Sequence, residues 1–400
     1  MGIRIALVDD NPHLAWDGRV YPANATFHRF VAAVLDVIGP DGRQPVERID
    51  HCVPLRPAME RPASLPLDPR IHVVGTVPFN GIAGYLRHAP ALTRRNAATL
   101  RPVIRSADLV WLKVPASNAP LAAALARSAG VPRFGYVAGR AADVAAGQDR
   151  RGFARIGAGL VGRAYDGLGR LSSIGGDRVV VGRRLAGDGI VTSLVEEDEI
   201  RSTASRAWPR EPGHLRLAWA GRLADGKGVD RLLGALAIMA AAPARGASGI
   251  SLTVIGDGPA RSSLVAHAAR LGVADRVDWR GFVADRAPYL DALAAADVFV
   301  FPSPAEGFPK VVLDAMAAGV PVLATPSGAL EEAVAAGAVG RIPADPAGIA
   351  ATIDLLVADP ARARVLRRAG TALVAAHTRP AEATRLVERW QRRWPELPWT

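Results

Sequence analysis

Short apolar runs alternate with longer segments of helical periodicity along this chain, and that alternation constrains its fold more than any other feature. Strands separated by helices need crossover connections, which build parallel sheets with helices on their faces. The alternation stops between residues 196 and 213, where the chain turns polar, and then restarts. We therefore predict an α/β protein with two doubly wound Rossmann-like domains facing a cleft, because such sheets bind ligands at the carboxyl ends of their strands.

The expected elements follow the same order in both halves. In the first half we expect strands at residues 3–8, 71–76, 109–114, 133–137, 179–181 and 190–194, and helices at 26–38, 85–105, 120–129 and 153–171. In the second half we expect strands at 215–220, 250–255, 277–279, 298–301 and 320–324, and helices at 229–242, 259–271, 287–296 and 310–318. An amphipathic segment at 380–393, followed by Trp394 and Trp399, is expected to dock onto one of the domains.

The chain has 400 residues, of which 50% are hydrophobic, and a formal net charge of +11. This length suits two domains that each bury a core. A charge of this size is also typical of proteins that bind nucleic acid or anionic membranes, but here it comes from scattered arginines without a long run or an aromatic repeat. Nucleic-acid binding is therefore the third choice of function, which salt-sensitive binding would reveal, and no nucleic-acid partner is expected.

The single cysteine indicates a reducing compartment, and the short apolar runs argue against a signal peptide or a transmembrane helix. Cys52 is the only cysteine, so no intrachain disulfide can form. The apolar run at residues 3–8 is too short for a signal-peptide core, and no run reaches the roughly 18 apolar residues of a transmembrane helix. We expect a cytoplasmic protein that could contact the inner face of the membrane peripherally.

The loop after the strand at 215–220 carries two cations, Arg222 and Lys227, five residues apart. Arginine offers a planar two-pronged donor and lysine a mobile point charge, and both suit a diphosphate. Lysine is rare in this chain, at positions 113, 227 and 310, so a lysine in this loop is better explained by a site than by solubility. A solvated surface position is the alternative for any single lysine.

Two further strand ends carry turn signals. Gly256-Asp257-Gly258 precedes a proline and a helix, an arrangement that allows close backbone approach and favours an anion at the helix start. Gly281-Phe282-Val283 could present its backbone to the edge of a nucleobase. A purely structural turn is the alternative at both places.

Two carboxylates, Glu306 and Asp314, lie eight positions apart around the loop and helix that follow the strand at 298–301. Carboxylates accept strongly from hydroxyl groups, and the free amides at the start of the helix favour an anion. This pair could grip a polyhydroxy ligand from two sides. An exposed loop with ordinary surface acids is the other interpretation.

Taken in order, these four motifs, with Ala-Ala-Gly-Val-Pro-Val at 317–322, resemble the donor-binding half of family-four retaining glycosyltransferases of the GT-B architecture, over about residues 215 to 345. The resemblance implies that Arg222 and Lys227 hold the donor diphosphate, that Glu306 and nearby amides hold the sugar, and that Asp314 holds the ribose. It implies the catalytic residues Arg222, Lys227 and Glu306, and the donor-binding residues Gly221, Gly256, Asp257, Gly258, Phe282, Val283, Gly307, Phe308, Pro309, Lys310 and Asp314.

The chain departs from this family in two places. The family usually has Glu at the second acidic position, and Asp314 is shorter by one methylene, roughly 1.5 Å. The first half lacks the usual Gly-Gly turn and has a loop at residues 9–19 instead, and no catalytic His is assigned. In that loop His13, Trp16, Asp17 and Arg19 are candidates for acceptor binding, with ordinary loop packing as the alternative.

The resemblance implies three regions: an acceptor-binding domain at residues 1–200, a donor-binding domain at 201–378, and a helix at 379–400 that packs back on the first domain. The implied function is a hexosyltransferase-type retaining glycosyltransferase that moves a sugar from a UDP- or GDP-linked donor to a small-molecule or lipid-linked acceptor. No cofactor and no metal site are expected. The alternative is a non-catalytic subunit that binds a sugar nucleotide without transferring the sugar. The oligomeric state is left open.

Overall fold

The computed structural model describes residues 2–22, 25–62, 64–78, 88–114, 116–137, 176–181, 185, 189–201, 208–209, 211, 213–241, 249–304 and 309–399. The chain forms two compact units. Unit 1 comprises Met1–Val181, Asp188–Thr192 and Arg379–Thr400, and unit 2 comprises Gly182–Gly187 and Ser193–Thr378.

Unit 1 is built on a sheet in the order β3-β2-β4-β1-β6-β7-β8, with β5 also paired to β4. All its strand pairs are parallel except β2 with β3. The strands are β1 (Ile3–Val8), β2 (His13–Trp16), β3 (Arg19–Pro22), β4 (Val46–Pro57), β5 (Ile71–Thr76), β6 (Leu109–Val114), β7 (Arg133–Val137) and β8 (Asp177–Val180). Since β4 and β6 lie on opposite sides of β1, the order of the strands reverses between β1 and β6.

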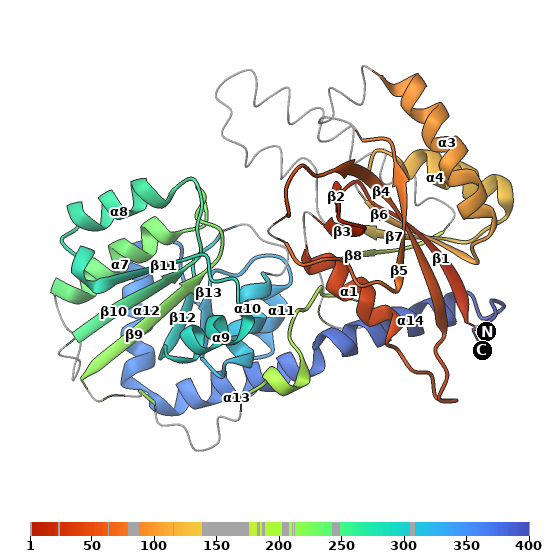
Figure 1. Cartoon of the computed structure of the whole chain (residues 1–400). Coiled ribbons are helices and arrows are strands. Elements are labelled where there is room, and N and C mark those ends of the chain that lie inside the picture. The colour runs from red at the N-terminus through yellow and green to blue at the C-terminus, as the bar shows by residue number, and fades with distance from the viewer. Residues whose placement is uncertain are drawn as a thin grey trace. The chain divides into compact units, whose positions relative to one another are not determined.

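Helices cover both faces of this sheet (Figure 1). The helices are α1 (Ala25–Leu35), α3 (Ala89–Arg105), α4 (Ala119–Ala129) and α14 (Arg379–Arg393). Along β1, Ile3, Ile5 and Leu7 join the core that contains α1 and α14, while Ala6 and Val8 join the core that contains α3 and α4. Alternate residues of one strand therefore belong to two cores, as the pleat requires.

The last helix belongs to unit 1, which confirms the predicted return of the C-terminal helix. In Figure 1 α14 lies beside α1, far from it in sequence. The indole of Trp390 is fully buried and packs edge-to-face against Trp111 and Phe134, with ring centroids 5.2 and 5.5 Å away. Aromatic packing of this kind anchors the terminal helix to the sheet.

Three expectations for unit 1 were wrong in detail. The structure has a long strand, β4, that was not predicted, because Arg48, Asp50 and His51 interrupt its apolar pattern. Residues 190–194 form no strand; the amide of Val191 donates instead to the carboxylate of Glu382. The chain expected to form a loop at residues 9–19 instead enters the β2–β3 hairpin, which runs from His13 to Pro22.

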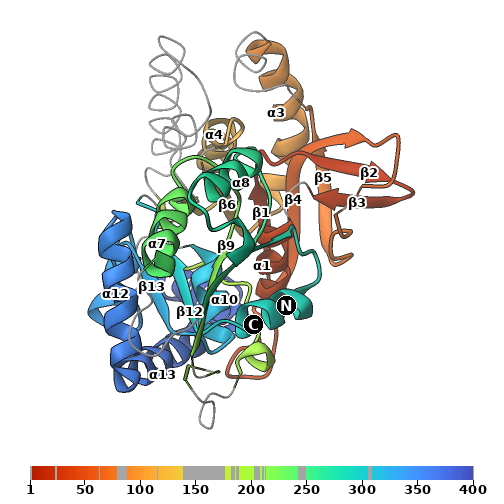
Figure 2. The ribbon, with the colours of Figure 1, turned by 90° about the vertical axis from the view of Figure 1, so that its left-hand side faces the viewer.

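The hairpin turns at Asp17 and Gly18, whose φ angles are 49° and 68°. Two central residues with positive φ define a type I′ turn, and an Asp-Gly pair is the strongest short-range hairpin signal. Figure 2 shows β2 and β3 beside β4 and β5. The hairpin could therefore have been predicted from these two residues.

Unit 2 has a parallel sheet in the order β11-β10-β9-β12-β13-β14. Its strands are β9 (His214–Ala220), β10 (Gly249–Ile255), β11 (Val277–Gly281), β12 (Val298–Phe301), β13 (Val322–Ala324) and β14 (Gly340–Arg341). Its helices are α7 (Val229–Ala241), α8 (Arg261–Arg270), α9 (Arg286–Ala294), α10 (Lys310–Ala317), α11 (Leu330–Ala335), α12 (Pro346–Ala358) and α13 (Pro360–Ala376).

The order of unit 2 is that of a Rossmann fold, so the predicted fold class of two Rossmann-like α/β sheets is confirmed. The strand order reverses between β9 and β12, and ligands of such sheets bind outside the carboxyl ends of the strands at that point. Within the described ranges no helix is long and apolar enough to cross a bilayer.

Trp390→Ala tests the anchoring of the terminal helix. We expect it to lower the free energy of unfolding of unit 1 by about 3–5 kcal/mol, because it opens a large cavity in a core. Hydrogen-exchange mass spectrometry measures this, since it reports on the amides of each unit separately. Ile38→Ala, at a residue 57% exposed in the same unit, is the control, with an expected change within about 0.5 kcal/mol. An equal loss in both variants would contradict the anchoring role.

Candidate functional site

The loop between β9 and α7 lies at the switch point of unit 2. The buried side chain of Leu223 anchors it, and the amide of Leu223 donates to the Asp257 carbonyl at 3.0 Å. On the same loop Arg222 is exposed and Lys227 is half-buried. The two cations therefore lie on the loop that follows the carboxyl end of β9. The sequence predicted this position in the chain.

Glycines bring the loops that follow three strands into direct contact. A Cβ added to Gly256 would lie 1.8 Å from the Gly221 carbonyl oxygen, and one added to Gly258 would lie 2.2 Å from that of Leu223. A Cβ on Gly228 would lie 2.2 Å from the carbonyl oxygen of Pro302, which follows β12. Side chains at these positions would push the loops apart, so the glycines have a structural reason that involves no ligand.

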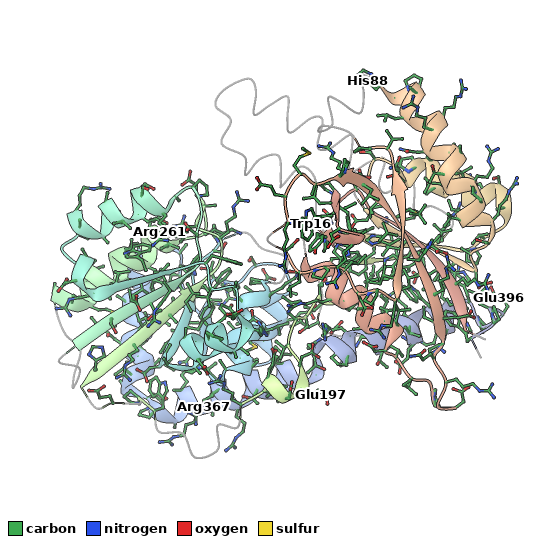
Figure 3. The ribbon with its side chains drawn as sticks, in the orientation of Figure 1. Trp16, His88, Glu197, Arg261, Arg367 and Glu396 are labelled. Carbon is green, nitrogen blue, oxygen red and sulfur yellow. The ribbon has the colours of Figure 1, made fainter. Side chains whose placement is uncertain are left out.

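The loop after β10 is held by its own aspartate. The carboxylate of Asp257 accepts from the amide of Gly258 at 2.7 Å and from Arg261 Nη1 at 3.2 Å. Arg261 begins α8 and is labelled in Figure 3. The structure thus places Asp257 as a cap of this turn, on the exposed side of the loop.

The turn after β11 exposes an aromatic ring. Gly281 has a φ of 68°. Its carbonyl oxygen accepts a hydrogen bond from the amide of Gly256 at 2.7 Å. Phe282 follows and is 79% exposed, while Val283 is half-buried. A phenylalanine exposed to this degree beside the switch-point loops offers an apolar surface to a planar ligand.

Part of the predicted site lies outside the described residues. Glu306, Gly307 and Phe308 fall in that part of the chain. Pro309 and Lys310, at the start of α10, are both half-buried. These two residues follow β12, so they belong to the strand end that Gly228 contacts through Pro302.

Asp314 lies in α10 and is 4% exposed. Its Oδ1 pairs with Arg286 Nη1 at 2.7 Å, and its Oδ2 accepts from the hydroxyl of Tyr289 at 3.1 Å. Arg286 in turn donates through Nε and Nη2 to the two carboxylate oxygens of Glu199, each at 2.9 Å. Both oxygens of Asp314 are therefore engaged by α9, and the shorter side chain of Asp suits this enclosed position.

The electrostatics of this group follow from burial and pairing. Burial raises the pKa of Asp314, although Arg286 and Tyr289 oppose the shift. Burial acts to lower the pKa of Arg286, but its bonds to Glu199 and Asp314 raise it overall. Burial and the nearby Asp314 hold the pKa of Tyr289 well above its ordinary value. Arg286 and Tyr289 therefore remain proton donors to Asp314 at neutral pH.

The sequence did not point to Arg286, Tyr289 or Glu199. Arg286 lies 87 positions from Glu199, and Tyr289 lies 25 positions from Asp314, so no local spacing links them. The one usable signal was the pair Arg286 and Tyr289 on one face of a short helix, and such i,i+3 pairs are common.

The four acceptor candidates of the first half separate in the structure. His13 is fully buried, while Asp17 and Arg19 are exposed at the tip of the β2–β3 hairpin. Trp16, labelled in Figure 3, is half-buried and packs edge-to-face with Tyr21, with ring centroids 6.3 Å apart. The hairpin therefore presents Trp16, Asp17 and Arg19 together and keeps His13 inside unit 1.

The chain is similar to known proteins in the sequence of unit 2 and in its fold. Residues 214–359 match the family described as glycosyl transferases group 1. The chain is 33% identical over 155 residues to a GDP-mannose-dependent alpha-(1-6)-phosphatidylinositol dimannoside mannosyltransferase of Mycobacterium tuberculosis, a match that covers 38% of each protein. It is 36% identical over 170 residues to a D-inositol 3-phosphate glycosyltransferase of Segniliparus rotundus, covering 40% of this chain and 36% of the relative.

These matches span well under two thirds of the relatives' lengths. The likeness of fold extends further. The crystal structure of Anabaena Alr3699/HepE in complex with UDP and glucose superposes with a TM-score of 0.64 at 16% identity, covering 98% of this chain and 99% of that one. This likeness supports the fold assignment for both units.

Arg286→Ala tests the buried pair at Asp314. Removing the guanidinium takes the cation away from the carboxylates of Asp314 and Glu199, so we expect a loss of about 3–5 kcal/mol in the free energy of unfolding at pH 7. Without Arg286, the pKa of folded Asp314 rises further above its unfolded value, and the loss relative to wild type should grow as the pH rises from 4 to 7. Urea unfolding at several pH values measures both effects.

Arg280→Ala is the matched control for this prediction, because Arg280 forms an exposed ion pair with Asp278 in the same unit. Exposed pairs contribute about 0–1 kcal/mol, so a small and nearly pH-independent change is expected there. A pH-independent loss in Arg286→Ala would show that Asp314 is not a buried charge that depends on Arg286.

Proposed function

Because the chain belongs to the group 1 glycosyltransferase family, we propose that it transfers a hexose-type sugar from a nucleoside diphosphate sugar to an acceptor hydroxyl. The observation that carries this proposal is the convergence of three loops at the switch point of unit 2. There Arg222 and Lys227 share one loop, and Gly228 places that loop against the strand end that leads to α10. A cationic, backbone-lined edge of this kind suits a diphosphate.

In this proposal each loop binds a different part of the donor. Arg222 and Lys227 hold the diphosphate, and the backbone at Gly256 and Gly258 lets it approach closely. The segment after β12 holds the sugar, through Glu306 and the amides that follow it. The exposed ring of Phe282 and the neighbouring Val283 flank the base.

The ribose is proposed to lie near Asp314 and its partners. Both oxygens of this carboxylate already accept from Arg286 and Tyr289, so its shorter reach is compatible with a contact that a water molecule bridges. A relative of this chain is named for its dependence on GDP-mannose, which makes GDP-linked sugars candidates alongside UDP-linked ones.

The proposed mechanism follows from the charges of the reaction. The bond between the anomeric carbon and the phosphate oxygen breaks, leaving negative charge on the diphosphate and positive charge on the sugar. Preorganised cations at Arg222 and Lys227 stabilise that negative charge by roughly 3–4 kcal/mol each. The acceptor oxygen bonds to the anomeric carbon on the face that the diphosphate leaves, and its proton passes to the leaving phosphate. This route retains the anomeric configuration and uses no side-chain base.

The acceptor is proposed to bind unit 1 at the tip of the β2–β3 hairpin. Trp16 offers a ring face, and the exposed Asp17 and Arg19 offer hydrogen bonds to a polyol or a phosphate. Relatives are named for a phosphatidylinositol dimannoside and for inositol 3-phosphate, so a small-molecule or lipid-linked polyol is the class we propose.

A nucleotide-binding measurement tests the donor site. UDP or GDP present at 100 times its dissociation constant should stabilise the folded protein by about 2.7 kcal/mol, measured as a thermal shift. Arg222→Ala/Lys227→Ala should lose the shift, because the diphosphate loses both cations. If neither nucleotide shifts the wild-type protein at millimolar concentration, the donor site is wrong.

A turnover measurement tests catalysis separately from binding. We expect Lys227→Ala to lower the transfer rate by about 10²–10³-fold, because it removes a cation that stabilises the negative charge of the leaving diphosphate. Glu306→Gln is expected to abolish transfer of the sugar while the protein stays folded. Mass spectrometry of a panel of donors and acceptors gives the rates, with Arg270→Ala, an exposed cation on α8, as the control. Donor binding without transfer or donor hydrolysis in wild type would favour a non-catalytic sugar-nucleotide-binding subunit.

A further inference from the structure

Three buried histidines converge inside unit 1, from three different elements. His13 begins β2, His28 lies in α1 and His51 lies in β4. Their ring centroids are 4.6 Å apart for His13 and His28, 5.2 Å for His13 and His51, and 5.1 Å for His28 and His51. One ring nitrogen of each lies within 4.8 Å of the others. From this arrangement we propose that His13, His28 and His51 bind a transition-metal ion, with Zn²⁺ as the leading candidate.

The first support is the number of buried nitrogens without a partner. His13 Nε2 and both ring nitrogens of His28 and of His51 make no hydrogen bond, and the three residues are 0%, 4% and 0% exposed. A buried polar atom without a partner costs about 1–3 kcal/mol, and phenylalanine would fill the same space without that cost. Several such nitrogens at one point are explained if a cation accepts their lone pairs.

The second support is the orientation of His13. Its Nδ1 lies 2.8 Å from the carbonyl oxygen of Asn11, and a carbonyl can only accept, so Nδ1 carries the proton. The lone pair of this imidazole is therefore on Nε2, which is buried and has no hydrogen-bond partner. Metal-binding histidines commonly donate their second ring nitrogen to a backbone carbonyl in this way, which sets the tautomer.

The third support is the protonation and charge of the surroundings. Burial lowers the pKa of all three histidines, and neutral imidazole is the form that binds metals. Asp9, itself 3% exposed, has its Oδ2 3.9 Å from His51 Nε2. The same oxygen accepts from Lys113 Nζ at 2.9 Å. Because Asp9 is paired with Lys113 and lies beyond hydrogen-bond distance of His51, we place its carboxylate outside the set of metal ligands.

The geometry also limits the ligand set. Cys52 follows His51 but belongs to the core on the opposite face of the sheet, so it does not reach the cluster. Three imidazoles are typical ligands of Zn²⁺, with nitrogen-to-metal distances of about 2.0–2.1 Å and water in the fourth position. Side-chain rotations that bring the three nitrogens to about 3.3 Å from one another would complete this tetrahedral geometry.

The consequence for the protein is a link between three elements of unit 1. The metal would join β2, α1 and β4, and β2 carries the hairpin whose tip holds Trp16, Asp17 and Arg19. It would therefore fix the base of the proposed acceptor-binding hairpin. The metal site itself does not depend on the proposed transferase function.

A metal titration of the full chain without a histidine tag tests the site. After removal of metal with a chelator, Co²⁺ should bind with one equivalent per chain and give the visible absorption of a tetrahedral nitrogen site, and Zn²⁺ should displace it. His28→Phe should weaken Zn²⁺ binding by at least about 100-fold while keeping the ring volume. His72→Ala, at a residue exposed on the neighbouring strand β5, is the control and should bind like wild type.

Stability measurements separate this proposal from simple ring packing. Zn²⁺ should raise the melting temperature of metal-free wild type and of His72→Ala, and should leave that of His28→Phe unchanged. If the histidines only pack, His28→Phe should melt at least as high as wild type with or without Zn²⁺. That result, or Co²⁺ binding that survives in His28→Phe, would overturn the metal site, whereas loss of nucleotide binding alone would not bear on it.

Discussion

Close backbone contact between glycine-bearing loops is the constraint on which the candidate site depends. The loops after β9, β10 and β12 touch at Gly256, Gly258 and Gly228, where a single Cβ would overlap a carbonyl oxygen of the next loop. Because the loops fit together only without side chains there, the backbone that carries Arg222 and Lys227 is held against Pro302, which follows β12. All three loops follow the carboxyl ends of neighbouring parallel strands, beside the point where the strand order reverses between β9 and β12.

Burial then assigns different roles to charged residues that look alike in sequence. Arg222 stays exposed on its loop, whereas Arg286 is paired on both sides by Glu199 and Asp314. A buried carboxylate stays ionised only with such partners, and both oxygens of Asp314 already bind Arg286 and Tyr289 of α9. The shorter acid at this position is thus part of a packed network, and a direct grip on a polyol is only one of its possible uses.

Unit 1 illustrates how a polar sequence can belong to a core. The strand β4 carries Asp50 and His51 in the middle of the sheet, and His51 meets His13 and His28 where three elements converge. The hairpin above this cluster and the returning helix α14 both depend on contacts between residues far apart in the chain. The metal that we propose would give the buried imidazoles the partners that the described protein atoms do not provide.

The sequence by itself determined the class of fold, most element positions and the motifs at the strand ends of unit 2, because strand and helix periodicity and Gly-rich strand ends are local signals. The strands Ile71–Thr76, Leu109–Val114 and Val298–Phe301 were predicted to the residue for this reason. Only the tertiary structure decided which side chains meet: Asp314 with Arg286 and Tyr289, and His13 with His28 and His51. Those contacts join residues separated by 15 or more positions, and their energies come from burial, which no local pattern records.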